Sequence, residues 1–461
     1  MAVTSTSIVV VNVTQTVAPT PSILQQSGAL ISQGGTNKAA NTLTLVPNLS
    51  TLNGILAAAK PISTLTWAGN VVTATTTAPH GWTVSDQVLA VIAGASPAGY
   101  NGTVTITITG ASTFTYPLTP NPGTMSVPGN VTLWSESELL QMGTTYFAQN
   151  GVNAVYVLEL GEGTPSEGVT ALSAWINTNP GIIYSYLVPR EWDNNSSFLA
   201  FLTNFNAPAA KTYFFVTTTQ ANMANYAGDK CVFALVEAPG VAATEFSCAA
   251  PFSDTLSFNP GSSTQVPPLS YAFLYGVTAW PASGNAATFL NIANANTNWI
   301  GTGAEGGISN TILFQGKLHD GNGFLYWYAA DWMQINADLN LSNEVINGSN
   351  SFPYLYYNQL GITRLQNRAI QVAQQSVANG LGNGSVIGTK LPIAQFTYNY
   401  LNGDYIGYIA INAEPLRVYV SENPTDYPAG IYRGLTCVFT PNSGFLQVIF
   451  NLNVTNILNP T

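Results

Sequence analysis

Residues 154–188 read AVYVLELGEGTPSEGVTALSAWINTNPGIIYSYLV, and the order of apolar runs within them indicates the fold class. The apolar run 154–160 has the length of a buried strand, and a Gly-Glu-Gly break follows it at 161–163. Apolar residues at helical spacing then cover 166–176, and 182–188 is a second apolar run of strand length. A strand, a helix and a second strand in this order indicate a βαβ crossover, which joins parallel strands.

The same alternation continues on both sides of this stretch. Downstream, the pattern predicts a helix over 196–205, a strand over 213–216, a short helix over 221–226 and a strand over 231–236. Upstream, a helix is expected from Ser135, with Glu138 completing a capping box. Further along, 269–277 is expected to be a buried helix, and a longer helix is expected from Ile362 to Asn379. The sequence therefore predicts an α/β fold with a largely parallel sheet.

Residues 63–133 have a different texture. Short runs of β-branched residues recur there, and Gly-, Asn- and Pro-containing turns separate them. Between Lys60 and Glu136 the only charged residue is Asp86. Short strands at this spacing are typical of a small sandwich or barrel. We therefore expect an all-β domain that is inserted into the α/β fold.

The two ends of the chain contain strands without obvious local partners. Residues 7–17 read as one strand that ends at a Pro-rich stop. Because a lone strand leaves its backbone groups unpaired, it must pair with a distant segment or with another chain. Near the other end, 435–439 and 445–454 are expected to form a hairpin. One face of its second arm carries Leu446, Val448, Phe450, Leu452 and Val454.

Composition limits the function. The chain has 461 residues, of which 46% are hydrophobic and 7% charged, against about 25% charged in a typical domain. The apolar fraction excludes a disordered chain. Lys and Arg number 11 against 21 Asp and Glu, and this balance excludes nucleic-acid binding, which needs clustered basic residues. A surface so poor in charge favours association, which fits a subunit covered by copies of itself or a secreted β-rich protein.

The sequence also bears on the compartment. No apolar run reaches the roughly 18 residues of a membrane span, and no basic region precedes Lys38 as a signal peptide would require. Cys231, Cys248 and Cys437 are odd in number and far apart, so a disulfide framework is not indicated and each is expected to be buried. We expect synthesis in a reducing cytoplasm and no membrane insertion.

Motifs for cofactors and metals are weak. Residues 301–306 match GxGxxG, with Asp320 downstream, but no strand and helix flank the glycines as a dinucleotide site requires. His80 and His319 are the only histidines, and they lie in different predicted domains. A zinc site or a histidine-based triad is therefore not expected. We predict no cofactor, no metal and no catalytic residue.

The sharpest enzymatic interpretation rests on carboxylates. Glu159 and Glu162 flank the end of a predicted strand, where α/β proteins place their sites. Asp331, Asp338 and Glu344 surround aromatic residues, as in a two-carboxylate glycosidase. The favoured interpretation is that the aromatic residues Trp327, Tyr328 and Trp332 pack a core while the carboxylates face water.

Several motifs together resemble the contractile tail sheath proteins of bacteriophages with myovirus tails, in particular a branch with compact sheaths. The match covers most of the chain and is least secure over 239–295. The motifs TAPHG at 77–81 and YNGT at 100–103 together resemble a small β module that is common in phage structural proteins. The more specific motifs are WIGTG at 299–303, GKLHDG at 316–321, ADWMQIN at 330–336 and YNQLGI at 357–362.

The resemblance implies a non-enzymatic structural subunit that forms hexameric rings stacked around an inner tail tube. It implies contraction that drives the tube through the host envelope, with further partners at the baseplate and the tail terminator. The protein would lie in the virion tail after assembly in the bacterial cytoplasm. The alternative is a virion-associated glycan-binding or glycan-hydrolysing protein.

The resemblance also implies an organisation of the chain. The terminal arms of neighbouring subunits would join a sheet in the C-terminal domain, so the interface residues would be Ile8, Val9, Val10, Val11 and Val13 of one arm and the apolar face from Leu446 to Val454 of the other. Arg364 and Arg368 are candidates for contact with an acidic tube surface, with an internal salt bridge as the alternative role. The expected parts are an N-terminal arm 1–20, a sheath domain 21–62 plus 134–300, the all-β insert 63–133, a C-terminal sheath domain 301–434 and a hairpin arm 435–461.

Overall fold

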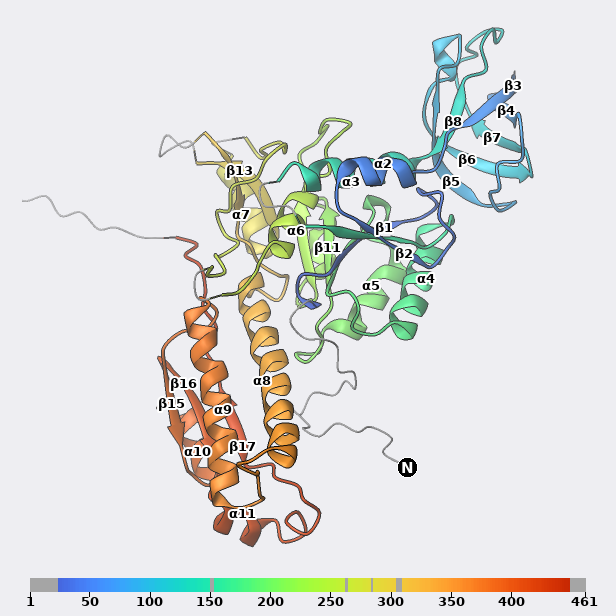
Figure 1. Cartoon of the computed structure of the whole chain (residues 1–461). Coiled ribbons are helices and arrows are strands. Elements are labelled where there is room, and N and C mark those ends of the chain that lie inside the picture. Colours follow the sequence, from blue (N-terminus) through green and yellow to red (C-terminus); the bar gives the residue numbers. More distant parts are fainter. Residues whose placement is uncertain (1–23, 150–152, 262–263, 283–284, 304–308, 448–461) are drawn as a thin grey trace, which may run out of the picture.

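The computed structural model describes residues 24–447 except 150–152, 262–263, 283–284 and 304–308. Within these residues the chain forms a main domain, a β-barrel and a C-terminal unit (Figure 1). A long helix, α8 (Phe324–Asn350), leads from the main domain into the C-terminal unit. None of the described helices is long and apolar enough to cross a membrane.

The main domain is built on an eight-stranded sheet in the order β14-β13-β12-β11-β10-β1-β9-β2. Neighbouring strands are parallel except that β2 is antiparallel to β9 and β14 is antiparallel to β13. Every residue of the central strands β1, β10, β11 and β12 is buried, as expected for parallel strands covered on both faces. The strands are β1 (Gly28–Ser32), β2 (Thr42–Val46), β9 (Val155–Glu159), β10 (Ser185–Leu187), β11 (Tyr213–Thr218), β12 (Val232–Val236), β13 (Asn298–Thr302) and β14 (Thr311–Phe314).

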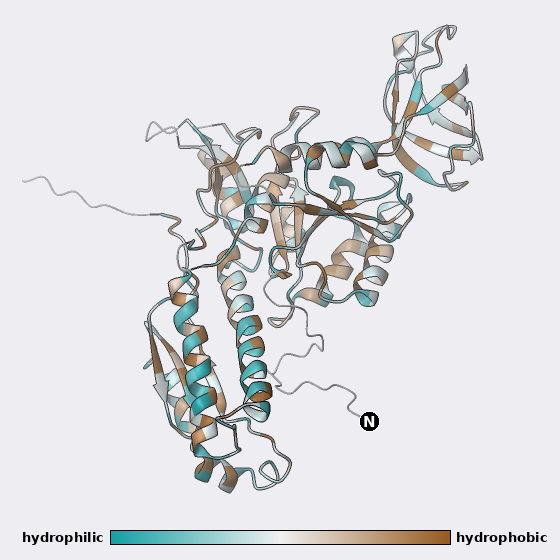
Figure 2. Cartoon of the chain, in the orientation of Figure 1, coloured by the Kyte–Doolittle hydropathy of each residue, from teal (hydrophilic) through white to brown (hydrophobic). Residues whose placement is uncertain are grey.

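Helices cover both faces of this sheet and create two apolar cores. On one face α4 and α5 pack around Trp175, Phe198 and Phe214. On the other face α3, α6 and the start of α8 pack around Phe215, Phe252 and Phe324. Figure 2 shows the strands in the middle of the sheet mainly in the brown of apolar residues. The helices of this domain are α2 (Leu49–Ile55), α3 (Trp134–Phe147), α4 (Pro165–Thr178), α5 (Ser196–Leu202), α6 (Ala249–Leu256) and α7 (Ala286–Asn294).

The inserted module is a closed barrel in the order β3-β4-β7-β6-β5-β8. Its core contains the fully buried residues Val72, Ile106 and Phe114. Lys60 at the start of β3 pairs with Val131 in β8, so the barrel begins and ends on adjacent strands, and α3 follows β8 directly. The strands are β3 (Lys60–Ala68), β4 (Val71–Thr76), β5 (Gln87–Ala93), β6 (Gly102–Gly110), β7 (Thr113–Pro117) and β8 (Asn130–Leu133).

The C-terminal unit has a three-stranded sheet in the order β15-β16-β17, in which β16 is parallel to β15 and antiparallel to β17. Helix α9 packs on this sheet, and the Gln366 side chain donates to the carbonyls of Thr389 and Ile411. The second half of α8 packs along α9 (Figure 1). The elements are α9 (Gln359–Ala378), β15 (Ser385–Thr389), α10 (Ile393–Leu401), β16 (Tyr408–Ala413), α11 (Leu416–Glu422) and β17 (Leu435–Val438).

The expected fold class, a mixed α/β fold with an inserted all-β module, is confirmed. Three details are corrected. Residues 269–277 are not a helix but an irregular segment beside β14. The main sheet continues through β13 and β14, past the boundary expected at residue 300. Residues 445–447 do not continue a hairpin, because Leu446 lies in a bend, and residues 448–454 of the expected strand lie outside the described residues.

Candidate functional site

The order of the parallel strands shows where a ligand site would be expected. The chain runs from β1 to β9 on one side and then to β10 on the other side, so the topological switch point lies between β1 and β10. In open α/β sheets, ligands bind outside the carboxyl ends of the strands at this point. A ligand at this point would contact the residues that follow β1, β9 and β10.

Glu159, the last residue of β9, fills one side of this edge. Its carboxylate is 1% exposed and accepts hydrogen bonds from the amides of Gly34, Thr36 and Gly161 at 2.6, 3.1 and 2.8 Å. The hydroxyls of Ser32 and Thr36 donate to it at 2.8 and 2.7 Å. Backbone amides that converge in this way bind anions. Here the protein's own carboxylate occupies the position, so Glu159 has a structural role.

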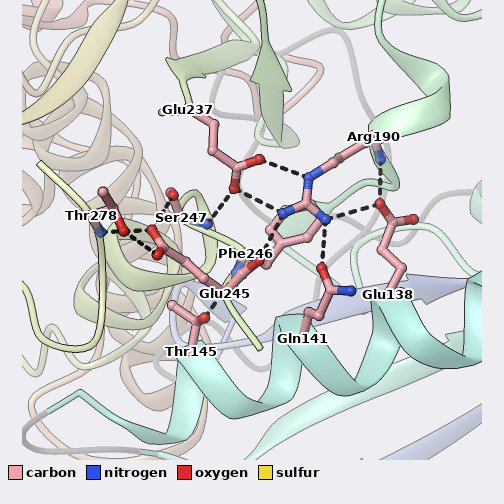
Figure 3. A network of polar contacts seen from close by, with 9 residues as sticks. All are labelled: Glu138, Gln141, Thr145, Arg190, Glu237, Glu245, Phe246, Ser247 and Thr278. Carbon is pink, nitrogen blue, oxygen red and sulfur yellow. Dashed lines mark hydrogen bonds and ion pairs between the residues drawn. The ribbon is translucent and has the colours of Figure 1, made fainter. Parts of the chain in front are cut away.

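Arg190, which follows β10, fills the other side (Figure 3). Its Nε and Nη2 atoms donate to the two carboxylate oxygens of Glu237, both at 2.8 Å. Its Nη1 atom donates to Gln141 at 3.0 Å and lies 3.4 Å from Glu138. Its guanidinium carbon lies 4.1 Å from the centre of the Phe246 ring. A single guanidinium thus connects the end of β10, the end of β12 and helix α3.

The network extends from Arg190 into the loop that follows β12. Arg190 Nη2 donates to the carbonyl of Glu245 at 2.8 Å. The Glu245 carboxylate accepts from the Ser247 hydroxyl at 2.6 Å and from the amide and hydroxyl of Thr278 at 2.7 and 2.6 Å. Burial raises the pKa of Glu138 to about 7, and the nearby charge of Arg190 opposes this rise. These contacts fix the loop on the carboxyl edge of the sheet.

The barrel covers what remains of the switch point. A cavity of about 50 Å³ lies between Gln87 and Leu89 of the barrel and Glu138, Pro189 and Glu191 of the main domain. A volume of this size accommodates one or a few water molecules and no organic ligand. The edge that binds ligands in other α/β folds is therefore a joint between two domains in this protein.

Sequence reasoning missed Arg190, Glu237 and Glu245, although a signal was present. Glu237 comes directly after a run that was predicted to be a strand, and Arg190 follows another such run after one proline. Because the carboxyl ends of parallel strands meet at one edge, the two residues could have been paired from the sequence. The capping box expected at Glu138 is wrong, since α3 has no side-chain cap and Glu138 contacts Arg190 instead.

The carboxylates of the glycosidase interpretation do not form a cleft. Asp331 is 2% exposed and accepts from the hydroxyls of Tyr184 and Tyr213 at 2.9 and 2.8 Å. Burial raises its pKa to about 6. Asp338 and Glu344 lie further along α8, and Glu344 pairs with an arginine of α9. Asp331 therefore anchors α8 to the main sheet rather than facing a substrate.

The histidines and the glycine motif are also accounted for by packing. His80 stacks on Trp82 in the barrel at 4.5 Å between ring centroids. His319 is buried in the main domain beside Thr297, and burial lowers its pKa to about 4. Gly301 lies within β13, which pairs with β14 instead of leading into a helix. Among the described residues, no group of three His, Cys, Asp or Glu could hold a metal ion.

The expectation for the cysteines is corrected in one case. Cys231 and Cys248 are buried, but Cys437 in β17 is exposed. The expectation rested on the spacing of the cysteines, which is not that of a metal site or a disulfide framework. Among the described residues, β17 has only β16 as a strand neighbour, which leaves Cys437 accessible.

The three-stranded sheet of the C-terminal unit has two open edges. No described strand lies beside β15 or β17 on the side away from β16. An open edge presents unpaired amides and carbonyls to a further strand. Large apolar side chains are also exposed on this unit, including Phe352, Leu360 and Ile406 at 87%, 78% and 82%. The unit thus combines open strand edges with apolar surface.

The predicted interface residues are placed as follows. Arg364 pairs with Glu344 of α8 and with the carbonyl of Pro353, while Arg368 Nη1 donates to Gln371 at 3.0 Å on the same helix. Leu446 is 40% exposed at the end of the described chain. The remaining predicted arm residues lie outside the described residues: Ile8, Val9, Val10, Val11, Val13, Val448, Phe450, Leu452 and Val454.

Comparisons with known proteins give similar structures only. No family model and no curated protein matches the sequence. A sheath tail protein of Listeria innocua is 9% identical with a TM-score of 0.38, covering 77% of this chain and 86% of that one. A sheath tail protein of Desulfitobacterium hafniense is 10% identical with a TM-score of 0.38, covering 82% and 91%. The contracted helical sheath of the anti-feeding prophage is 10% identical with a TM-score of 0.45, covering 98% and 99%. These three solved structures are sheath proteins.

Proposed function

We propose that the chain is a structural subunit of a contractile tail sheath. Copies polymerise as stacked hexameric rings around an inner tail tube, and contraction of the sheath drives the tube through the host envelope. The subunit assembles in the bacterial cytoplasm, and its ends meet the baseplate and the tail terminator. No catalytic step is part of this role.

The observation that carries the proposal is the open β15-β16-β17 sheet in a chain with unpaired strands predicted at both ends. Residues 7–17 of one copy and the segment after Leu446 of another would extend the sheet of a third copy by strand addition. About five hydrogen bonds at about 1 kcal/mol each contribute roughly 5 kcal/mol. Association costs about 4–15 kcal/mol, so one arm alone binds weakly. Many arms together stabilise a lattice, because each contact made after the first is effectively intramolecular.

The buried networks support the mechanical part of the proposal. Arg190 connects two strand ends to α3, and Asp331 connects α8 to Tyr184 and Tyr213 of the sheet domain. A domain fixed in this way moves as a unit, so the change during contraction would lie between subunits. The energy of contraction would then be stored in two alternative packings of one lattice.

Removal of the N-terminal arm tests the proposal. The full chain should form tubes or long polymers in electron micrographs, whereas a chain lacking residues 1–20 should remain as monomers or isolated rings. Val10→Pro should have a similar effect, because proline removes an amide donor from the strand. Val10→Thr is the matched control, since threonine keeps the branched β-carbon and the amide. Unchanged polymers after the deletion would contradict the role of the arm.

The tube-facing role of Arg364 and Arg368 is a separate part of the proposal. Arg368 is the stronger candidate, because it donates to Gln371, a neutral side chain on its own helix, whereas Arg364 is paired with Glu344. Arg368→Glu should weaken assembly around an acidic tube, and Arg368→Lys should retain it. Cosedimentation with the tube protein measures this effect, and equal binding of the two variants would contradict the contact.

A further inference from the structure

A second cavity lies where the described chain ends. Its volume is about 270 Å³, and it opens between the start of α8, the turn after β14 and residues 443–446. Lining side chains include Leu269, Leu325, Tyr326 and Leu446. Neither the internal network of the main domain nor the open sheet of the C-terminal unit involves this cavity.

An aromatic edge lies beside the cavity. Residues 271–275 lie along β14, because the amides of Tyr271 and Leu274 donate to the carbonyls of Leu313 and Thr311 at 2.7 and 2.9 Å. Leu274 points inward and is 2% exposed. Tyr271, Phe273 and Tyr275 alternate with it and are 41%, 50% and 39% exposed. We call residues 271–275 the aromatic edge.

Two polar features on this surface have no partner among the described residues. Phe273 lies opposite Ile312 of β14, and the hydrogen bonds on either side of this pair are made by the backbone groups of residues 272 and 274. The amide and the carbonyl of Phe273 itself are not hydrogen-bonded within the described chain. The Oε1 atom of Gln315, which lines the cavity, is buried and likewise has no partner there. A buried acceptor without a donor is costly, so the Gln315 oxygen fits a donor from an added segment. The amide and carbonyl of Phe273 fit the backbone of an added extended segment as groups of an open strand edge do.

We propose that residues 448–454 of the same chain occupy the aromatic edge in the unassembled subunit. The described chain ends beside this surface, since the Tyr271 hydroxyl donates to the Leu446 carbonyl. In an extended segment after Leu446, Val448, Phe450 and Leu452 share one face, and Ile449, Asn451 and Asn453 lie on the other. The apolar side chains on that face would pack against the side chains of the aromatic edge. The backbone amides and carbonyls of the segment would pair with those of Phe273.

The tether decides between this chain and a neighbour as the source of the segment. A segment joined to the edge by one or two residues has an effective concentration in the millimolar range. A neighbouring copy at micromolar concentration competes poorly with it. If the proposed sheath function holds, the segment is stored on its own subunit until a lattice neighbour offers a better edge, which delays premature polymerisation.

Amide exchange at residue resolution tests the proposal on the full chain at dilute, monomeric concentration. The Phe273 amide is the reporter, and the Tyr271 and Leu274 amides, which donate to β14, are internal references. Phe450→Asp should accelerate exchange at Phe273 on the order of tenfold or more, given the effective concentration of the tether. Asn451→Asp introduces the same charge on the opposite face and should leave exchange unchanged.

Each other outcome overturns the proposal. Equal exchange at Phe273 in the wild-type chain and the Phe450→Asp variant means that the segment lies elsewhere. Protection at Phe273 that grows with protein concentration assigns the edge to a neighbouring copy. Protection of residues 385–389 instead of Phe273 assigns the segment to the C-terminal sheet. Because the measurement needs no polymer, its failure is distinguishable from failure of the sheath proposal, which electron microscopy of polymers tests.

Discussion

At the scale of single residues, several of the few charged side chains of this chain pair with one another inside the main domain. The guanidinium of Arg190 donates to both carboxylate oxygens of Glu237, and Glu138 lies on the other side of this guanidinium. The sequence placed Arg190 and Glu237 after apolar runs, so their common edge was predictable. The role of Glu138 was not, because Arg190 is 52 residues away and a local pattern suggests a capping box.

Arg190→Met tests the cost of breaking this network. The substitution keeps the aliphatic volume but leaves Glu138 and Glu237 buried without their cation. Removing one partner of a buried ion pair costs about 3–5 kcal/mol, and we expect the free energy of unfolding in urea to fall by this amount. Lys38→Met is the matched control, because Lys38 is exposed; its effect should stay within about 0.5 kcal/mol. Equal effects of the two variants would show that the network does not contribute to stability.

The buried carboxyls also predict a pH dependence. Burial raises the pKa of Glu138 and of Asp254 to about 7, above the values of 4.5 and 3.8 of unfolded chains. The folded state therefore binds more protons than the unfolded state up to about pH 7, and stability is lost as pH rises through this value. His80 and His319, whose pKa values are lowered, act in the opposite direction, but mainly below their ordinary value of 6.5.

We therefore expect the melting temperature to fall as the pH rises from 6.5 to 7.5 and to level off above this range. Asp254→Asn should reduce this slope, because the amide does not ionise. Thermal unfolding of the monomer in buffers of equal ionic strength measures the effect. A melting temperature that rises over this range would contradict the assignment of the raised pKa values to the folded state.

At the scale of elements, periodicity predicted the alternation from α3 to β12, the helix α9 and the strand β17, but it did not predict β1, β2, β13 to β16 or the helices α2, α6, α7, α8, α10 and α11. The only glycine or proline in residues 269–277 is Gly276, near the end of the run. An apolar run of this length does not distinguish a strand from a helix. Their alternation, with Leu274 buried between exposed Phe273 and Tyr275, fits the edge of β14 instead. The sequence also missed β8, whose four residues close the barrel through pairing with β3 and β5.

The junction of α8 and α9 offers a matched pair of glycine substitutions. A β-carbon at Gly361 in the first turn of α9 would lie 2.0 Å from the carbonyl oxygen of Tyr356, whereas one at Gly54 in α2 would meet no atom within 4 Å. Gly361→Ala should destabilise the fold by about 1–3 kcal/mol through overpacking. Gly54→Ala should stabilise it by up to about 1 kcal/mol through helix propensity.

Chemical unfolding of the two alanine variants measures this difference. Because both substitutions add one methyl group to a helix, a difference in propensity does not explain opposite signs. Equal effects would mean that the connection before α9 moves away from Gly361 at little cost. In that case α8 and α9 would be less firmly joined than their packing indicates.

At the scale of the whole molecule, the alternation of strands and helices and the texture of 63–133 indicated an α/β fold with an all-β insert. The sequence did not show that one helix continues from the main domain into the C-terminal unit. Helix α8 starts in the core of the main domain, where Phe324 lies 5.5 Å from the Tyr213 ring, and continues beside α9. Because α8 belongs to both units, the main domain does not end at the boundary expected at residue 300. In Figure 2 much of α8 and α9 beyond the main domain is teal, which gives little apolar periodicity to read.

The insertion of the barrel leads to the last prediction. Lys60 and Pro61 pair with Val131 and Asn130, so the two ends of the insert lie side by side. Replacing residues 60–133 with a short Gly-Ser linker should therefore leave the main sheet and the C-terminal unit folded. Circular dichroism should retain the helical signal, although the stability should fall, because the excision uncovers the joint around Glu138 and Pro189. If the barrel is displayed outward, the shortened chain should still polymerise, and the polymers should be narrower in electron micrographs. A folded chain that no longer polymerises would instead place the barrel in contacts between neighbouring subunits.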